Sequence, residues 1–138
     1  RLLRKFRIAA TLVPQPVLRP APHMTEFGVI YFGSTAPAMR EALDDLETEG
    51  RSVDAMRLRA FPFPDSVLEF ITSHDRVFVV EQNRDAQLKT LLVNDSNVNQ
   101  SRLISVLHYD GTPITARFIT QAIESYLQGA TALIKEAA

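Results

Sequence analysis

The sequence predicts an α/β fold whose sheet is parallel or mostly parallel and is covered by helices on both faces. Two observations support this prediction. Short apolar runs alternate with longer segments in which apolar residues recur every three or four positions. The apolar run at residues 76–80 also passes through a few polar residues directly into an amphipathic segment, as a buried parallel strand does when it leads into a helix. Such alternation builds parallel sheets with right-handed crossovers.

The composition is that of a globular protein of about one domain. The chain has 138 residues, of which 46% are hydrophobic and 22% are charged. Its net charge of -1 gives no reason to expect a nucleic acid or an anionic membrane as partner. The chain contains no cysteine, so it forms no disulfide, thiolate nucleophile or thiolate-bound iron–sulfur cluster of its own. No apolar run approaches the ~20 residues of a membrane span.

The first 25 residues are basic and rich in proline. Five of the 15 basic residues precede the first acidic residue, Glu26, and four of the eight prolines lie within the first 22 positions. We interpret residues 1–7 as the end of a helix from a preceding domain and residues 13–25 as an extended linker. A transit peptide is the alternative, although the prolines interrupt the amphipathic helix that such peptides form. The α/β domain is therefore expected to span residues 26–138.

The first predicted strand covers residues 27–33 and leads into a helix. Ser34 and Thr35 are placed to cap this helix, and Pro37 is tolerated in its first turn. Gly50 is a natural end point. The helix has one apolar face, which consists of Met39, Ala42, Leu43 and Leu46.

The second predicted strand covers residues 53–59 and ends before Pro62 and Pro64. A short helix follows, in which Ser66 and Glu69 have the spacing of a capping box. Its inward-facing residues are expected to be Val67, Phe70 and Ile71.

The remaining elements are a third strand at residues 76–80, a helix at about residues 84–93 and a fourth strand at residues 103–107. The last helix begins at residues 112–113. Gly129 ends it, or a frayed tail continues to Ala138. The inner face of this helix is expected to contain Ile114, Phe118, Ile119, Ala122, Ile123 and Tyr126.

Polar residues follow the third strand directly and mark the first candidate site. In open α/β sheets such strand ends face the crevice where ligands or partners bind, which directs attention to Glu81, Gln82 and Asn83. Asn83 is also suited to cap the next helix. Glu81 needs solvent, a cation or hydrogen bonds at the end of a buried strand, and a salt bridge to Arg84 or Arg57 is the structural alternative to a site role.

Arg57 and Arg59 form a second candidate site at the end of the second strand. Two arginines that alternate with an apolar residue can clamp a carboxylate or a phosphate through paired hydrogen bonds. Surface or ion-paired arginines are the alternative. The adjoining residues 60–64 hold two aromatic rings and two prolines, which pack over the sheet edge or press against another domain.

The sequence lacks several well-known catalytic and nucleotide-binding motifs. The chain lacks a phosphate loop of the GxxxxGK[ST] type, a GxGxxG fingerprint after its first strand and a GxSxG elbow. His108 and Asp110 suggest acid–base work without an accompanying nucleophile motif, so a small hydrolase is one rival interpretation. A free-standing flavodoxin-like binding module, with the Ser34 and Thr35 hydroxyls near a phosphate, is the other. The spacing of the histidines predicts no metal site for His23, His74 and His108.

Three segments in order carry a family resemblance, namely residues 27–50, 54–92 and 107–119. Their most specific pieces are RLRAFPFP at residues 57–64 and VVEQNRDAQ at residues 79–87. Together they resemble the C-terminal domain of the α subunit of 2-oxoacid:ferredoxin oxidoreductases, with the 2-oxoglutarate enzymes as the nearest branch. The resemblance covers most of residues 1–120 and implies a transketolase C-terminal-like domain, a three-layer α/β/α sandwich with a mostly parallel sheet.

The resemblance also implies a function. Enzymes of this family are cytoplasmic and use thiamine diphosphate with Mg and an iron–sulfur cluster to convert a 2-oxoacid and CoA into an acyl-CoA, passing electrons to ferredoxin. This domain would bind none of these cofactors alone and would pack against the β subunit and the preceding domains of the α subunit. Glu81, Gln82, Asn83 and Arg84, followed by Arg57 and Arg59, are then the expected rim facing those neighbours or the substrate and CoA channel.

Overall fold

The computed structural model describes the backbone of residues 1–137 and the side chains of residues 1–129. Its centre is one five-stranded sheet with the strand order β1-β3-β2-β4-β5. Four strands are parallel, and β1 at one edge runs antiparallel to β3. The strands are β1 (Val17–Arg19), β2 (Phe27–Phe32), β3 (Asp54–Leu58), β4 (Arg76–Glu81) and β5 (Leu103–Leu107).

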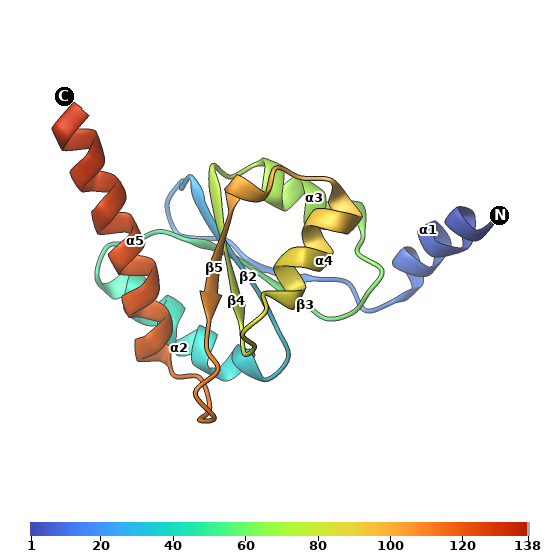
Figure 1. The fold of residues 1–138 in the computed structure, drawn as a ribbon, viewed down its shortest axis with the longest axis horizontal. Coiled ribbons are helices and arrows are strands. Elements are labelled where there is room, and N and C mark those ends of the chain that lie inside the picture. The colour runs from blue at the N-terminus through green and yellow to red at the C-terminus, as the bar shows by residue number, and fades with distance from the viewer. Residues whose placement is uncertain (138) are drawn as a thin grey trace.

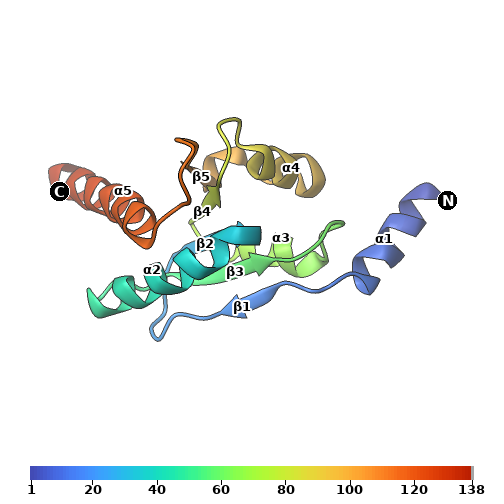
Figure 2. The same ribbon diagram turned by 90° about the horizontal axis from the view of Figure 1, so that it is seen from below.

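Helices cover both faces of the sheet. Figure 2 shows α2 and α5 on one side and α3 and α4 on the other, which confirms the three-layer α/β/α prediction. The helices are α1 (Leu2–Leu12), α2 (Ala36–Thr48), α3 (Asp65–Thr72), α4 (Gln87–Ser96) and α5 (Ala116–Ala137), with short 3₁₀ turns at Gly33–Thr35 and Gln100–Arg102. None of the helices within residues 1–137 combines the length and the apolar character that a membrane crossing requires.

Two hydrophobic cores lie on opposite faces of the sheet. Successive residues of a strand point to opposite faces, so Phe78 and Val80 of β4 pack under α2 and α5, while Val77 and Val79 pack under α3 and α4. This central strand is buried on both faces, as its continuous apolar run predicts. The predicted inner face of α2 is likewise confirmed, since all four of its residues are buried: Met39, Ala42, Leu43 and Leu46.

The predicted helix caps are wrong in two places. Thr35 occupies the N-cap position of α2 but makes no side-chain capping bond, because its backbone angles are helical rather than extended. Its hydroxyl and that of Ser34 instead accept hydrogen bonds from Gln82. The proposed capping box at Ser66 and Glu69 also fails. The N-cap position of α3 is Pro64, which places Ser66 inside the first turn rather than before it.

The last helix begins later than predicted and follows the longer of its two predicted ends. Thr115 accepts a hydrogen bond from the backbone N–H of Phe118 at 3.1 Å and so caps α5 three residues after the predicted start at 112. Ile114 is buried as predicted, although it lies before the helix. Gly129 does not end the helix, which continues to Ala137. The predicted tail at Ala138 lies outside the described residues.

The segment predicted as a linker contains a strand. Residues 17–19 pair with β3, and the backbone N–H of Ala21 donates to the Asp54 carboxylate at 2.7 Å. Pairing with β1 protects an edge of the sheet that would otherwise expose unpaired backbone groups. Before this strand, α1 extends away from the body of the molecule (Figure 1), and its exposed apolar residues are Leu2, Leu3, Phe6, Ile8 and Leu12.

Candidate functional site

The candidate site lies at the carboxyl ends of the parallel strands. β2 is the strand at which the order reverses, because β3 pairs with one of its edges and β4 with the other. Ligands of open α/β sheets bind outside the strand ends at such a reversal. The residues that follow β2 and β4 therefore occupy the position where a site is expected.

Gln82 joins the two strand ends. Its side-chain amide Nε2 donates hydrogen bonds to Ser34 Oγ at 3.1 Å and to Thr35 Oγ1 at 3.2 Å. Gln82 follows β4, and the two hydroxyls lie in the 3₁₀ turn after β2. The hydroxyls on which the flavodoxin-like interpretation depends are thus already bound by an amide of the same chain.

Glu81 is fully buried, with 0% of its surface exposed. Its Oε1 accepts hydrogen bonds from the backbone N–H of Leu88 at 2.6 Å and from Asn83 Nδ2 at 3.0 Å, and its Oε2 accepts one from the N–H of Lys89 at 3.2 Å. These N–H groups belong to the first turn of α4, where helical partners are absent and a negative charge is favourable. The carboxylate therefore anchors α4 from inside the protein.

The alternative interpretation of Glu81 as half of a salt bridge is wrong. Arg84 is exposed and pairs with Asp85 at 2.8 Å, and Arg57 makes no ion pair. The predicted capping role of Asn83 is confirmed, since its Oδ1 accepts a hydrogen bond from the N–H of Gln87 at 3.2 Å. α4 begins at Gln87 rather than at 84, because the preceding Ala86 has a left-handed backbone with φ of 51°.

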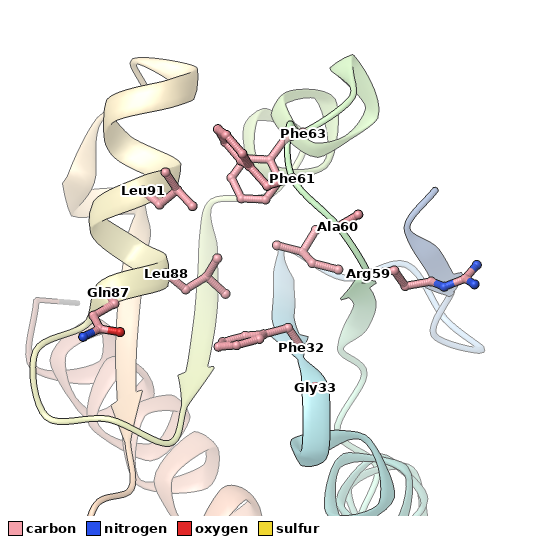
Figure 3. A pocket seen from close by; sticks show the side chains of 10 residues that line it. Phe32, Gly33, Arg59, Ala60, Phe61, Phe63, Gln87, Leu88 and Leu91 are labelled. Carbon is pink, nitrogen blue, oxygen red and sulfur yellow. The ribbon is translucent and has the colours of Figure 1, made fainter. Parts of the chain in front are cut away.

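An apolar pocket opens beside this turn, on the face covered by α3 and α4. It has a volume of about 410 Å³, and Figure 3 shows Leu88 and Leu91 of α4 facing the aromatic rings of the segment after β3. Phe61 and Phe63 meet edge to face, with ring centroids 5.1 Å apart. The lining consists of Phe32, Gly33, Leu58, Arg59, Ala60, Phe61, Phe63, Gln87, Leu88 and Leu91.

Much of the pocket rim is apolar and open to solvent. Phe61 is 47% exposed, and Phe32 and Leu91 are exposed to a similar degree. We call Phe32, Phe61 and Leu91 the apolar rim. Phe61 lies in the aromatic segment that the sequence indicates as a contact surface, whereas Phe32 and Leu91 were not predicted. Two signals point to them. Phe32 is an aromatic residue at the last position of a strand, and Leu91 is a leucine just off the buried face of α4.

The predicted site residues fall into separate groups. Glu81, Gln82 and Asn83 come together around the start of α4, as described above. Arg57 projects to the face covered by α2, and Figure 3 shows the side chain of Arg59 directed away from the pocket. The expectation that all of them form one rim facing a neighbour stays a prediction, and the geometry divides it between the two faces of the sheet.

The buried histidines have structural contacts. His74 lies just after α3, with Nδ1 2.7 Å from the carbonyl oxygen of Phe70 and Nε2 2.8 Å from Asp54 Oδ2. His108 packs edge to face on Phe118 and approaches Asp110 at 3.4 Å. These contacts of His108 include no nucleophile, so the hydrolase interpretation gains no support. Within the described part of the chain, no three His, Cys, Asp or Glu side chains form a group that could hold a metal ion.

The fold is a three-layer α/β/α module of the kind found in transketolases. A split-gene transketolase, determined as an inactive β4 tetramer, matches with a TM-score of 0.62 and 18% identity over 83% of this chain and 41% of that chain. The chain itself belongs to the family "Pyruvate:ferredoxin oxidoreductase core domain II", whose family model matches residues 25–117. This confirms the predicted relationship to the 2-oxoacid:ferredoxin oxidoreductases.

Two further solved structures share the fold. The 2-oxoglutarate:ferredoxin oxidoreductase from Magnetococcus marinus, with 2-oxoglutarate, coenzyme A and succinyl-CoA bound, matches with a TM-score of 0.75 and 24% identity over 85% of this chain. The present chain spans 20% of that chain's length. The alpha chain of a probable 2-oxoacid ferredoxin oxidoreductase from Thermoplasma acidophilum matches with a TM-score of 0.55 and 24% identity, covering 83% of this chain and 97% of that one. No curated protein matches by sequence.

Proposed function

We propose that this chain is the assembly domain of the α subunit of a cytoplasmic 2-oxoglutarate:ferredoxin oxidoreductase. The whole enzyme decarboxylates the 2-oxoacid oxidatively to an acyl-CoA and passes the electrons to ferredoxin. Within it, this domain packs against the β subunit and the other domains of the α subunit. The family match over residues 25–117 and the apolar rim at the strand ends support this proposal.

The described residues offer no free buried carboxylate for the Mg ion of thiamine diphosphate. A diphosphate-bound Mg ion takes carboxylate ligands, and Glu81 is the buried carboxylate of the described residues. Both of its oxygens are already engaged by the start of α4. The proposal therefore places thiamine diphosphate, Mg and the iron–sulfur cluster on other parts of the enzyme.

The apolar rim is the observation that carries the assembly role. Contiguous apolar surface beside a shaped hollow marks protein–protein contacts, and aromatic residues dominate the energy of such contacts. Phe61 and Phe63 are held by flanking prolines, so they lose little conformational freedom when a partner covers them. The hollow between them and Leu91 can receive an apolar side chain from that partner.

The test is assembly of the complete enzyme from its α and β subunits with changes at the rim. Phe61→Ser and Leu91→Ser each remove exposed apolar surface, so we expect the affinity between the subunits to fall about tenfold or more. Met24→Ser is the matched control, because Met24 is fully exposed and lies before β2, at the opposite end of the sheet. Unchanged assembly of both rim variants, measured by analytical ultracentrifugation, contradicts the docking role.

A second measurement tests the activity. We expect 2-oxoglutarate- and CoA-dependent reduction of ferredoxin by the complete enzyme and none by this chain alone. Alanine substitutions of the exposed strand-end residues Gln82 and Arg84 test whether these residues face a neighbouring subunit or the substrate channel. Turnover and subunit association are measured together. Turnover by the isolated chain overturns the proposal.

A further inference from the structure

Arg57 is a partly buried arginine that has no partner among the described residues. Its side chain makes no hydrogen bond or ion pair with them, and its Nε is buried and unsatisfied. A buried guanidinium N–H that lacks an acceptor costs free energy, and it is rare in folded proteins. The terminal nitrogens of the group are not fully enclosed, so an acceptor from outside the chain can reach them.

Further positive charges gather around Arg57 on the face covered by α2. Arg57 lies beside Tyr31, its register partner on β2. Arg59 follows just beyond the end of β3, with its side chain directed away from the apolar pocket (Figure 3). Burial raises the pKa of the Tyr31 hydroxyl, and the positive charges of nearby arginines act against this rise. The arginines that act on Tyr31 are Arg57, Arg19 and Arg40.

Among the described residues, Arg19 is the one of these arginines that forms ion pairs. It pairs with two carboxylates of α2, Asp44 at 2.7 Å and Glu47 at 3.1 Å. Arg40 takes part only through its carbonyl oxygen, which accepts from Arg19 Nη1 at 3.4 Å. Within the described residues, the side chains of Arg40, Arg57 and Arg59 form no ion pair with a carboxylate.

We propose that Arg57, Arg59 and Arg40 form a binding site for a phosphate-bearing small molecule at the carboxyl end of β3. The Tyr31 hydroxyl, which stays protonated at neutral pH, adds a further donor. Arg57 lies on the opposite face of the sheet from the apolar rim, so a failure to bind phosphate leaves the proposed assembly role standing.

The number of donors favours phosphate over carboxylate. One guanidinium fork already satisfies the two oxygens of a carboxylate, whereas a phosphate monoester presents three oxygens and about two negative charges. A site that gathers the guanidinium groups of Arg40, Arg57 and Arg59 would match the larger anion in both charge and hydrogen-bond capacity. Arginine is also the side chain that recognises phosphate through two bonds at once.

The experiment is an NMR titration of the ¹⁵N-labelled chain with inorganic phosphate, and separately with acetate, at constant ionic strength. We expect saturable shifts of the arginine Nε–H signals of Arg57 and Arg59 with phosphate, and weaker shifts with acetate. Arg57→Gln should weaken phosphate binding about tenfold or more, and Arg57→Lys should restore only part of it, because the ammonium group loses the two-bond geometry. Arg59→Gln, at an exposed position, tests the site without a risk to the fold.

Arg76→Gln is the matched control. Arg76 is another partly buried strand arginine, but it lies at the opposite end of the sheet and already donates to the carbonyl oxygen of Asp75. Equal phosphate binding by Arg57→Gln and the unchanged chain overturns the proposal. So do shifts of the Arg76 signal as large as those of Arg57, which show unspecific binding. Acetate binding as tight as phosphate binding overturns the phosphate assignment.

Discussion

The carboxylate of Glu81, at the end of β4, accepts a hydrogen bond of 2.6 Å from the backbone N–H of Leu88, seven residues further along the chain. This contact lies at the point where the central strand turns into α4. Glu81, a charged residue that the sequence suggests as a ligand-binding group, therefore anchors the start of α4 inside the protein. The contact also fixes Leu88 and, through the helix, Leu91 in the wall of the apolar pocket.

Glu81→Ala should destabilise the protein strongly. The change leaves the N–H groups of Leu88 and Lys89 without an acceptor in a buried place, and we expect the free energy of unfolding to fall by about 3 kcal/mol. Urea denaturation measures this loss. Glu81→Gln keeps one acceptor oxygen and should lose about half as much, while Glu69→Ala on the exposed surface should change little. An alanine variant as stable as the unchanged chain disproves the anchoring role.

Gly28→Ala should be destabilising for reasons of space. A Cβ at Gly28 would lie 2.8 Å and 2.9 Å from two ring atoms of Phe70 and 3.2 Å from His74 Nδ1. Overpacking of this kind costs about 1–3 kcal/mol, which thermal unfolding detects. Adding Phe70→Leu should recover part of the loss. The control is Gly129→Ala, where nothing lies within 4 Å and the helix should gain up to about 1 kcal/mol.

Asp54→Ala should release the segment before β2. The two oxygens of Asp54 hold the N–H of Ala21 at 2.7 Å and His74 Nε2 at 2.8 Å, so they connect this segment to the end of α3. We expect a loss of about 1–3 kcal/mol and faster hydrogen exchange at residues 17–25, measured by mass spectrometry. Asp95→Ala, at an exposed position on α4, serves as control. Exchange that speeds up uniformly along the chain, rather than in this segment, argues against a local tie.

Asp110 should titrate below the ordinary range of an aspartate. Hydrogen bonds from the side chain and the backbone N–H of Thr112 lower the pKa of this carboxyl. A lowered pKa in the folded state means that the stabilising effect is present above the ordinary aspartate pKa and is lost as the pH falls through the folded value. Thr112→Val should move the pKa upward in an NMR titration of the carboxyl carbon, whereas Thr90→Val should not. An unmoved titration in Thr112→Val rules out the hydroxyl as the cause.

The spacing of apolar residues predicted the buried faces correctly, because the face of a helix or strand that packs on the core carries apolar residues at regular intervals. The periodicity of α2 and the apolar run of β4 predicted their cores correctly. Helix starts were harder to predict, because a cap depends on which donor is nearest in space. Ser34 and Thr35 have the residue types of a cap, yet Gln82, 47 or more positions away in sequence, binds both.

The sequence by itself determined the fold class, the order of the parallel strands and helices along the chain, and the family, since all three depend on local periodicity and on short ordered motifs. The tertiary structure alone decided that β1 pairs with β3, that Glu81 is satisfied by backbone groups rather than by an arginine, and that Arg57 has no partner among the described residues. Hydrogen-bonding and charged side chains act on whichever groups the fold brings within about 3 Å. Such groups belong to residues that are distant in sequence, so no periodic pattern in the sequence indicates that they meet.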